Sequence, residues 1–471
     1  MAGVDIPFVG PSYTGRSTNV NAQECINLYP EIDNTEGKNV IALYSTPGLQ
    51  LFSALETTGK IRGLLAVNST LYAVCANTLY EIDSDGNKTS RGTIDGSNDV
   101  SMVHNGLELF ISTGENNGKT AYSYRLSDND LSLISDPDFD GSDIVAYLDG
   151  YFIWNVPDSQ KFQISSILDG RNVDALDFSS SEMRPDNIVS VGVNQRELWM
   201  FNANSAEVFF NSGNADFPFE RVPSGGIEWG CNAARSVASI DNSIIWLSNR
   251  NTVMAATSYA PREISNNVVS YEIGSYDRVD DAIAYTYAEG GHSFYVITFP
   301  SADVTWVYDM RTNFWHKRKS FGQGRHRGHT KAQIGNKIYI GDYNSADVFI
   351  QSLDYYTDNG TPIERIRRSQ VLHAREDRIF MKELQIDFEE GTAILTGQGS
   401  DPHAMLRFSD DGGHTWSNEL LASIGKRGQW QTRALWRRLG SFRERVFELR
   451  ITDPIKVVII KAVGLLYPGR H

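Results

Sequence analysis

A repeat of 38 to 49 residues runs through most of this 471-residue chain. Each copy contains an apolar run, a tight polar turn and a second apolar run that carries an aromatic residue. These aromatic residues are Tyr72, Phe110, Phe152, Trp199, Trp246, Tyr295 and Tyr339. A third apolar run follows each of them after about ten residues, so each copy reads as short strands joined by turns.

The clearest copy lies at 280–319, where four apolar runs are separated by three turns rich in Gly, Pro, Asp and Asn. The runs alternate with a period of two and are rich in Val, Ile, Tyr, Phe and Trp, which favours β-strands. The expected strands are 282–287, 293–299, 304–310 and 314–319. An antiparallel sheet of this size cannot bury both of its faces by itself, so it needs neighbours of the same kind.

Four-stranded units with a period of about 40 to 50 residues are typical of a β-propeller, in which each sheet, or blade, packs on the next until the ring closes. We therefore expect an all-β chain with a β-propeller at 59–370. We expect seven four-stranded blades, with six as the alternative if the first or last unit packs elsewhere. A large β-sandwich would instead place strands every 8 to 12 residues, roughly, without a longer period.

Two further regions flank the repeat. Residues 1–58 are irregular and polar, and we expect them to form an extended N-terminal arm or small platform. Residues 371–471 lack the repeat but contain strong strand patterns at 383–388, 404–409, 445–451 and 456–466. We expect these residues to form a separate antiparallel C-terminal domain that resembles a β-sandwich.

The net charge of −15 is unevenly distributed. Residues 1–310 contain 17 Lys and Arg against 40 Asp and Glu, whereas residues 311–471 contain 26 against 18. An acidic body with a basic C-terminal third indicates two different electrostatic roles. The basic residues could face an acidic partner or phosphates, or could form ion pairs between domains or subunits. Aromatic residues are not interleaved with them as in a groove that binds single strands, which favours ion pairs.

Cys25, Cys75 and Cys231 are far apart and form no Cys-x-x-Cys pair, so we expect them to be reduced and buried. The chain has no run of about 18 apolar residues. Its first residues lack the basic and apolar segments of a signal peptide. We therefore expect neither a signal peptide nor membrane insertion.

The sequence lacks the common catalytic motifs G-x-S-x-G, H-E-x-x-H, the P-loop and G-x-G-x-x-G. We expect no catalytic residue, no cofactor, no metal site and no enzymatic activity. Two alternatives stay open: a propeller-type glycosidase or depolymerase, and a receptor-binding propeller. A glycosidase would need two carboxylates about 5–10 Å apart at the centre of the propeller, and the expected first strands there are mostly apolar or small.

Residues 409–416 fit the pattern S-x-D-x-G-x-T-W, the Asp-box hairpin found in sialidase-type propellers. The pattern has a mechanical cause, because the Asp side chain accepts backbone N–H groups within the turn and Gly permits a positive φ. We interpret it as a structural turn. Its residues are Ser409, Asp411, Gly413, Thr415 and Trp416.

Arginines recur near the C-terminus and form, with one tryptophan, a candidate assembly interface. Its residues are Arg433, Trp436, Arg437, Arg438, Arg443 and Arg445. Two other basic clusters lie at 316–327 and 365–368. Either could meet an acidic partner or be used in internal ion pairs.

Two stretches carry a resemblance to a known family. One is N-terminal and includes Pro11-Ser12-Tyr13, the segment 23–31 and the Pro47-Gly48-Leu49 turn. The other runs from 433–440, with Leu435-Trp436-Arg437-Arg438, into the strand pattern at 445–452. With the blade-like repeats between them, the chain resembles the packaged-DNA stabilisation proteins, also called tail hub or nozzle proteins, of short-tailed bacteriophages (podoviruses).

The resemblance implies a structural virion protein located in the tail and assembled in the cytoplasm of the host bacterium. Proteins of this kind form a homohexameric ring below the portal and its adaptor ring. The implied ring retains packaged DNA, forms the DNA exit channel and mounts the tail needle or plug and the tailspikes. Contact with exiting double-stranded DNA is then transient, which agrees with an acidic body that repels phosphates.

Overall fold

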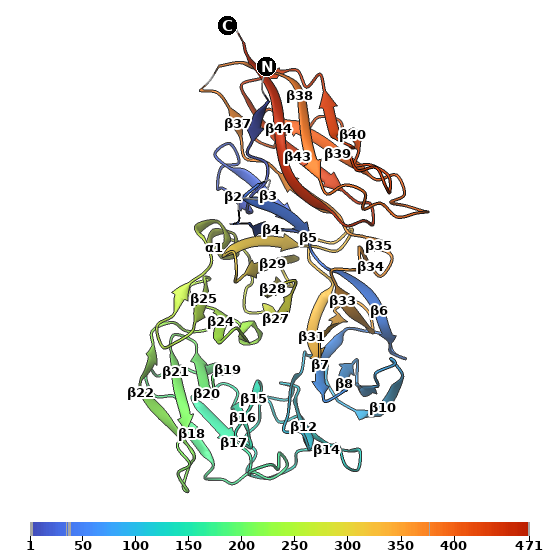
Figure 1. The fold of residues 1–471 in the computed structure, drawn as a ribbon. Helices are drawn as coiled ribbons and strands as arrows, with labels where there is room; N and C mark the ends of the chain where they lie inside the picture. Colours follow the sequence, from blue (N-terminus) through green and yellow to red (C-terminus); the bar gives the residue numbers. More distant parts are fainter. Residues whose placement is uncertain (1–2, 34, 36–38, 376, 470–471) are drawn as a thin grey trace. The chain divides into compact units, whose positions relative to one another are not determined.

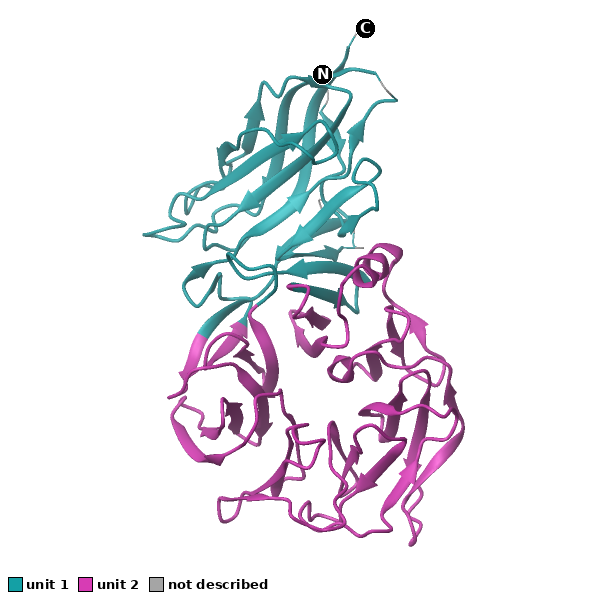
Figure 2. Ribbon diagram, turned by 180° about the vertical axis from the view of Figure 1, so that it is seen from behind, with its two compact units in different colours: residues 1–50, 304–326, 352–471 teal, residues 51–303, 327–351 magenta. Residues whose placement is uncertain are grey.

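The computed structural model describes residues 3–33, 35, 39–375 and 377–469. The chain divides into two compact units (Figure 2). Unit 1 comprises residues 1–50, 304–326 and 352–471, and unit 2 comprises residues 51–303 and 327–351. Apart from one short 3₁₀ turn, η1 (Ala234–Ser236), the helical structure of the described residues is α1 (Asn267–Gly274). The side chain of Asn266 caps α1 by accepting the N–H groups of Val268 and Val269.

Unit 2 contains five antiparallel sheets of four consecutive strands each, counted over its described residues (Figure 1). The first two sheets are β7 (Ile61–Val67), β8 (Thr70–Cys75), β9 (Thr78–Ile82) and β10 (Lys88–Thr93), then β11 (Ser101–His104), β12 (Glu108–Ser112), β13 (Ala121–Arg125) and β14 (Asp130–Leu133). The third is β15 (Val145–Leu148), β16 (Tyr151–Asn155), β17 (Lys161–Ile164) and β18 (Phe178–Ser180). The last two are β19 (Ile188–Asn194), β20 (Glu197–Asn202), β21 (Ala206–Asn211) and β22 (Phe219–Ile227), then β23 (Ala238–Ile240), β24 (Ser243–Leu247), β25 (Val253–Ala256) and β26 (Arg262–Glu263).

Two shorter groups of strands complete unit 2. One is the hairpin β27 (Ile283–Glu289) and β28 (His292–Phe299). The other is β31 (Gly328–Ile334), β32 (Lys337–Asp342) and β33 (Asp347–Ser352). The first strands line the axis in a closed circle, from β7 through β27 to β31, which lies against β7 again. Unit 2 is therefore a β-propeller.

Aromatic side chains of the second strands fill the spaces between neighbouring sheets. All seven aromatic residues that mark the repeat lie in second strands and are buried. Phe110 stacks against Trp154 with ring centroids 5.1 Å apart, and Phe201 contacts Trp246 at 5.0 Å. Burial of each such aromatic side chain stabilises the packing of neighbouring sheets by about 2 kcal/mol.

The prediction of seven like four-stranded blades is wrong. Six sheets of three or four strands lie within the described residues of unit 2, which is the alternative count of six. The stretch 280–319, taken as the clearest blade, is divided between the units. Its last strands, β29 (Val304–Asp309) and β30 (Phe314–Arg318), belong to unit 1. In unit 1, Lys317 of β30 forms a parallel bridge to Ile26. This edge of β30 is therefore paired, unlike the outer edge of a propeller blade.

Unit 1 is a sandwich of two sheets. One has the order β4 (Leu28–Ile32), β5 (Ile41–Ser45), β44 (Val458–Pro468), β38 (Ile379–Phe388) and β41 (Ala434–Arg437), with β1 (Val4–Ile6) and β42 (Ser441–Phe442) at its sides. The other continues β30 with β3 (Ala22–Ile26), β36 (Arg365–Arg368), β43 (Glu444–Ile451), β39 (His403–Ser409) and β40 (Leu420–Ser423), with β2 (Tyr13–Thr14) and β37 (Leu372–His373) at its sides. A parallel bridge joins β6 (Gly48–Ala54) to the hairpin β34 (Thr357–Asp358) and β35 (Thr361–Pro362).

The N-terminal residues do not form the extended arm that the sequence predicts. Ile6, Phe8, Cys25, Leu28 and Leu43 are buried in the same apolar core as the C-terminal strands. Asn27 anchors this segment, because its side-chain amide donates to the carbonyls of Lys319 and Glu364, both at 2.9 Å. The prolines interrupt the strand pattern and make the segment look irregular in the sequence. The apolar residues between them nevertheless pack in the core and place the segment in the sandwich.

Candidate functional site

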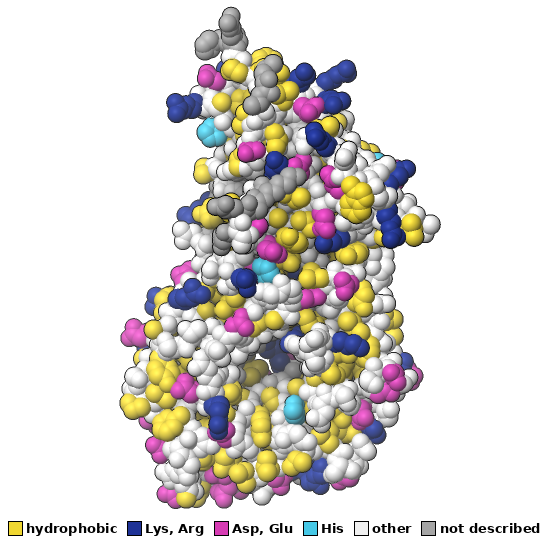
Figure 3. Space-filling model, in the orientation of Figure 1, with side chains coloured by type: hydrophobic (Ala, Val, Ile, Leu, Met, Phe, Trp, Pro, Cys, Tyr) yellow, Lys and Arg dark blue, Asp and Glu magenta, His cyan; other side chains and the backbone are white. Residues whose placement is uncertain are grey.

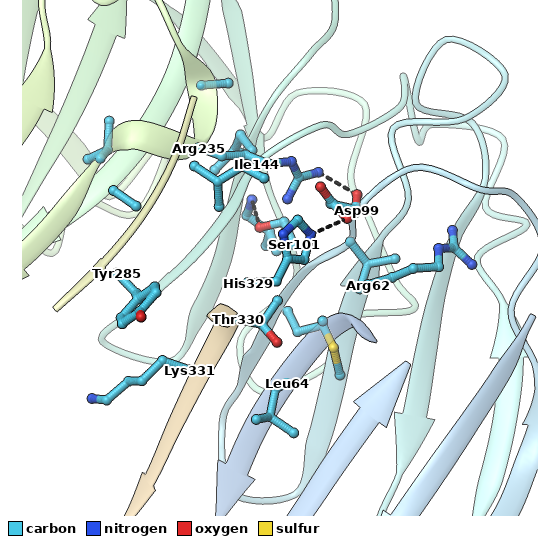
Figure 4. Close-up of a pocket in the computed structure, with 18 of the residues that line it drawn as sticks. Arg62, Leu64, Asp99, Ser101, Ile144, Arg235, Tyr285, His329, Thr330 and Lys331 are labelled. Atoms are coloured by element: carbon cyan, nitrogen blue, oxygen red, sulfur yellow. Dashed lines mark hydrogen bonds and ion pairs between the residues drawn. The ribbon is translucent and has the colours of Figure 1, made fainter. Parts of the chain in front are cut away.

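A cavity of about 300 Å³ lies on the axis of the propeller (Figure 4). Its walls come from the first strands or the residues just before them, including Leu64, Ser101, Ile144, Tyr285 and Lys331. Several blades thus meet in one place, as expected where the first strands of a propeller converge. Figure 3 shows an opening in this part of the molecule with basic side chains inside it.

Asp99 is the centre of a charged cluster in this cavity. Its carboxylate lies 2.8 Å from His329 Nε2 and 2.7 Å from Lys60 Nζ, and its backbone carbonyl accepts a hydrogen bond from Arg235. Burial would raise the pKa of Asp99, but the hydrogen bond from His329 and the charges of His329 and Lys60 hold it well below its usual range. Asp99 is therefore a carboxylate that ties together sheets far apart in the sequence.

The cavity also contains three cationic side chains. Arg62 is buried and donates to the carbonyls of Ala76 and Asn98, and burial lowers its pKa. Burial also lowers the pKa of Lys331. All three side chains line the cavity, and Arg62 and Arg235 are already hydrogen-bonded to backbone carbonyls.

This arrangement does not match a glycosidase centre. Asp99 is the one carboxylate among the cavity-lining residues, and it is held in ion pairs instead of facing a second carboxyl group. Within the described parts of the chain, no group of three or more His, Cys, Asp or Glu side chains has the geometry to hold a metal ion. We interpret the axial cavity as the space enclosed by the first strands where the blades of the propeller meet.

The Asp-box segment forms the turn that leaves β39. The Asp411 carboxylate accepts the N–H groups of His414 and Thr415 at 2.9 and 2.8 Å, and the hydroxyls of Ser409 and Thr415. Hydrogen bonds from these side chains lower the pKa of Asp411. Gly413 has a φ of +99°, which a side chain would make unfavourable. Trp416 lies under the guanidinium of Arg407, 4.7 Å from the ring centroid.

The candidate interface residues fall into two groups. Trp436 and Arg445 are buried, at 3% and 2% exposure: the indole of Trp436 donates to the Leu420 carbonyl, and Arg445 binds both oxygens of Asp410. These two are part of the sandwich itself. The exposed members are Arg433, Arg437, Arg438 and Arg443.

The basic cluster at 365–368 is internal to unit 1. Arg365 and Arg367 are fully buried, and Arg368 pairs with Glu24 at 2.7 Å and Glu448 at 2.6 Å. Glu24 and Glu448 were not predicted as site residues. Their partner Arg368 lies hundreds of residues after Glu24 in the chain and faces Glu448 across a strand pair. The register pairs Glu448 of β43 directly with Arg368 of β36, a neighbour that no local sequence pattern indicates.

Two family models match the chain. One, described as the bacteriophage P22 Gp10 β-propeller, matches residues 4–355, and the other, the bacteriophage P22 Gp10 β-sandwich, matches residues 364–463. The chain belongs to the bacteriophage P22 Gp10 family. It is therefore a structural protein of a phage, as the resemblance to the tail hub and DNA-stabilisation proteins implied.

No curated protein matches this chain. Among solved structures, the chain is similar to virginiamycin B lyase from Staphylococcus aureus, with 11% identity and a TM-score of 0.47 over 65% of this chain and 99% of that one. It is also similar to the extracellular domain of the putative one-component system BT4673 from B. thetaiotaomicron, with 9% identity and a TM-score of 0.45 over 86% of this chain and 60% of that one. No helix among the described residues is long and apolar enough to cross a membrane.

Proposed function

We propose that this protein is the tail hub, or nozzle, of a short-tailed phage: a homohexameric ring below the portal and adaptor that retains the packaged DNA. One observation carries the proposal, namely that both parts of the chain match the P22 Gp10 family. In this role the ring forms the DNA exit channel, mounts the tail needle or plug and the tailspikes, and is assembled in the bacterial cytoplasm.

The charge of the propeller supports this proposal. Unit 2 contains 18 Lys and Arg against 36 Asp and Glu, a net charge of −18, whereas unit 1 contains 25 against 22, a net charge of +3. Carboxylates repel DNA phosphates, so an acidic body lets DNA pass without adhering. Exposed arginines on unit 1 (Arg433, Arg437, Arg438 and Arg443) supply cations for contacts with acidic neighbours in the ring.

The test uses capsids that are filled with DNA but lack the tail. Purified protein is added, and the DNA that becomes accessible to nuclease is measured over time. We expect the protein to slow DNA loss strongly and to remain bound to the capsid after sedimentation. Unchanged DNA loss, with the protein left in the supernatant, would contradict the proposal.

A further inference from the structure

Two exposed surfaces, one on each unit, have complementary chemistry. The first, the tip patch, is formed in unit 1 by β40 and the loops 391–401 and 424–433. The ring of Trp430 lies against Gly391, and Lys426 pairs with Asp401 at 3.2 Å, so these contacts hold the two loops together.

The tip patch is both apolar and basic. Leu395, Leu421 and Trp430 are 73%, 66% and 68% exposed, so these segments present three large apolar side chains to solvent. The loop 424–433 contains three basic residues, Lys426, Arg427 and Arg433, and no Asp or Glu. Tryptophan and arginine together are the residue types most enriched at the energetic centres of protein interfaces.

The second surface, the blade-edge patch, lies on β18 and the segments 136–140 and 174–177 of unit 2. Leu176 is 77% exposed and Phe178 is 41% exposed. Among the described residues β18 is the outermost strand of its sheet, so one of its edges is not paired with another strand of that sheet. Two contacts bind the neighbouring acidic segment to it: Val173 N–H donates to Asp136, and Lys161, over the ring of Phe178, pairs with Asp140 at 2.5 Å.

The blade-edge patch is strongly acidic. Its segments contain five aspartates, of which Asp138 and Asp174 are exposed; the five are Asp136, Asp138, Asp140, Asp174 and Asp177. Lys161 lies beside them and pairs with Asp140. The patch therefore combines exposed apolar side chains with acidic ones, the chemical complement of the tip patch.

We propose that the tip patch of one copy of this chain docks on the blade-edge patch of a second copy. Charge complementarity selects this occupant: a basic apolar surface and an acidic apolar surface are both exposed on the same polypeptide. Because the two patches differ, the contact is heterologous, and repeated heterologous contacts close into a ring when the rotation permits. This inference rests on the proposed hexamer and identifies its contact surfaces.

Cross-linking between two single-cysteine variants tests this contact. Ala175→Cys and Gln431→Cys, at exposed positions beside Leu176 and Trp430, are made in separate chains, one of which carries a size tag, and the mixture is treated with a short bis-maleimide. The native cysteines are buried, so they react little. We expect the mixed, tagged–untagged dimer to form about tenfold more than dimers in either variant alone. The matched control replaces Ala175→Cys by Lys337→Cys, an exposed position on another sheet of unit 2.

Exchanging the charges of the two patches tests whether their charge complementarity forms the contact. Asp138→Lys with Asp174→Lys in the chain that carries Ala175→Cys should lower the mixed dimer about tenfold, because like charges then face each other. Arg427→Asp with Arg433→Asp in the chain that carries Gln431→Cys should restore it. A mixed dimer no more abundant than with the Lys337→Cys control, or no restoration by the swap, would overturn the inference.

The outcome is separable from the proposed function. Protein that retains DNA in capsids but fails the cross-linking test is a hub whose ring uses other surfaces, and this inference is then wrong. Protein that passes the cross-linking test but retains no DNA has the contact described here without the proposed role.

Discussion

At the scale of single residues, buried arginines hold the N-terminal segment of unit 1 in place. Arg367 is fully buried and donates to the carbonyls of Phe8 and Pro11 at 2.6 and 2.9 Å. It also donates to the side chains of Gln23 and Cys25. One side chain therefore satisfies four acceptors that come from a segment more than 300 residues earlier in the chain.

Replacing Arg367 by methionine should destabilise unit 1 by about 3 kcal/mol, because two buried carbonyls lose their donor and are not solvated. The measurement is chemical denaturation followed by tryptophan fluorescence. Arg443→Met is the matched control: its side chain is exposed, so its effect should stay within about 0.5 kcal/mol. Equal effects of the two substitutions would show that the contacts of Arg367 add nothing to stability.

The Asp-box carboxylate makes a pH-dependent contribution to stability. The pKa of Asp411 is lowered in the folded protein by hydrogen bonds from Ser409 and Thr415. An unfolded Asp has a pKa of about 3.9. The contribution is therefore present above that value and is lost as the pH falls toward the folded-state pKa.

The variant Asp411→Asn tests this sign. At pH 7 its Tm should lie below that of the unchanged protein, and the difference should shrink as the pH is lowered below about 4. The two Tm values are measured by calorimetry at a series of pH values. A difference that stays constant across the series would mean that the charge of Asp411 is not what stabilises the turn.

At the scale of elements, the propeller closes through a side-chain cluster as well as through packing. β31 supplies His329, while Asp99 and Lys60 lie just before β11 and β7. Asp99→Asn removes the charge that both cations face, and should destabilise unit 2 by roughly 2 kcal/mol. Hydrogen exchange of the β31 amides should accelerate at the same time.

A matched control for Asp99→Asn is Asp85→Asn. Asp85 is an exposed residue in the turn between β9 and β10. Its replacement should leave the exchange of β31 unchanged. If Asp99→Asn also leaves β31 unchanged, the ion pairs do not close the ring, and apolar packing between β31 and β7 is sufficient.

The elements of the propeller could largely be predicted from the sequence because they depend on local patterns. Turn residues such as Asp149, with a φ of +49°, and the aromatic residues that follow them mark hairpins that span only a few residues. The fate of 280–319 could not be predicted in this way. Whether β30 ends a blade or pairs with β3 is decided by Ile26, almost 300 residues earlier, and no local pattern records such a pairing.

The candidate site residues could likewise be predicted only where their contacts are local in the chain. The pattern at 409–416 predicted a turn, and its hydrogen bonds are local. The arginines at 433–445 all look alike in the sequence, yet Arg445 is buried against Asp410 while Arg437 is exposed. Arg437 lies in β41 and Arg445 in β43, which belong to different sheets, and only the strand pairing shows which side chains each sheet buries.

At the scale of the whole molecule, the exposed arginines of unit 1 should matter for assembly and not for folding. Arg437 lies on the surface in an ion pair with Glu383, and Arg438 is also exposed. The double substitution Arg437→Glu with Arg438→Glu should leave the Tm of the isolated chain within about 2 °C of the unchanged protein. It should reduce the retention of DNA in capsids about tenfold.

The matched control reverses two exposed arginines of unit 2, Arg184→Glu with Arg278→Glu. It changes the net charge by the same amount at a different surface and should retain DNA normally. If the Arg437 and Arg438 variant also retains DNA normally, those arginines are not part of an assembly contact.

Imaging of the portal vertex is the most direct test of whether this chain is the hub of a phage tail. Capsids filled with DNA but without a tail are incubated with the protein, and the vertex is reconstructed by electron cryo-microscopy. We expect six copies arranged as a ring around the DNA exit channel, each with a propeller and a sandwich. A vertex without added density, or with a number of copies other than six, would contradict it.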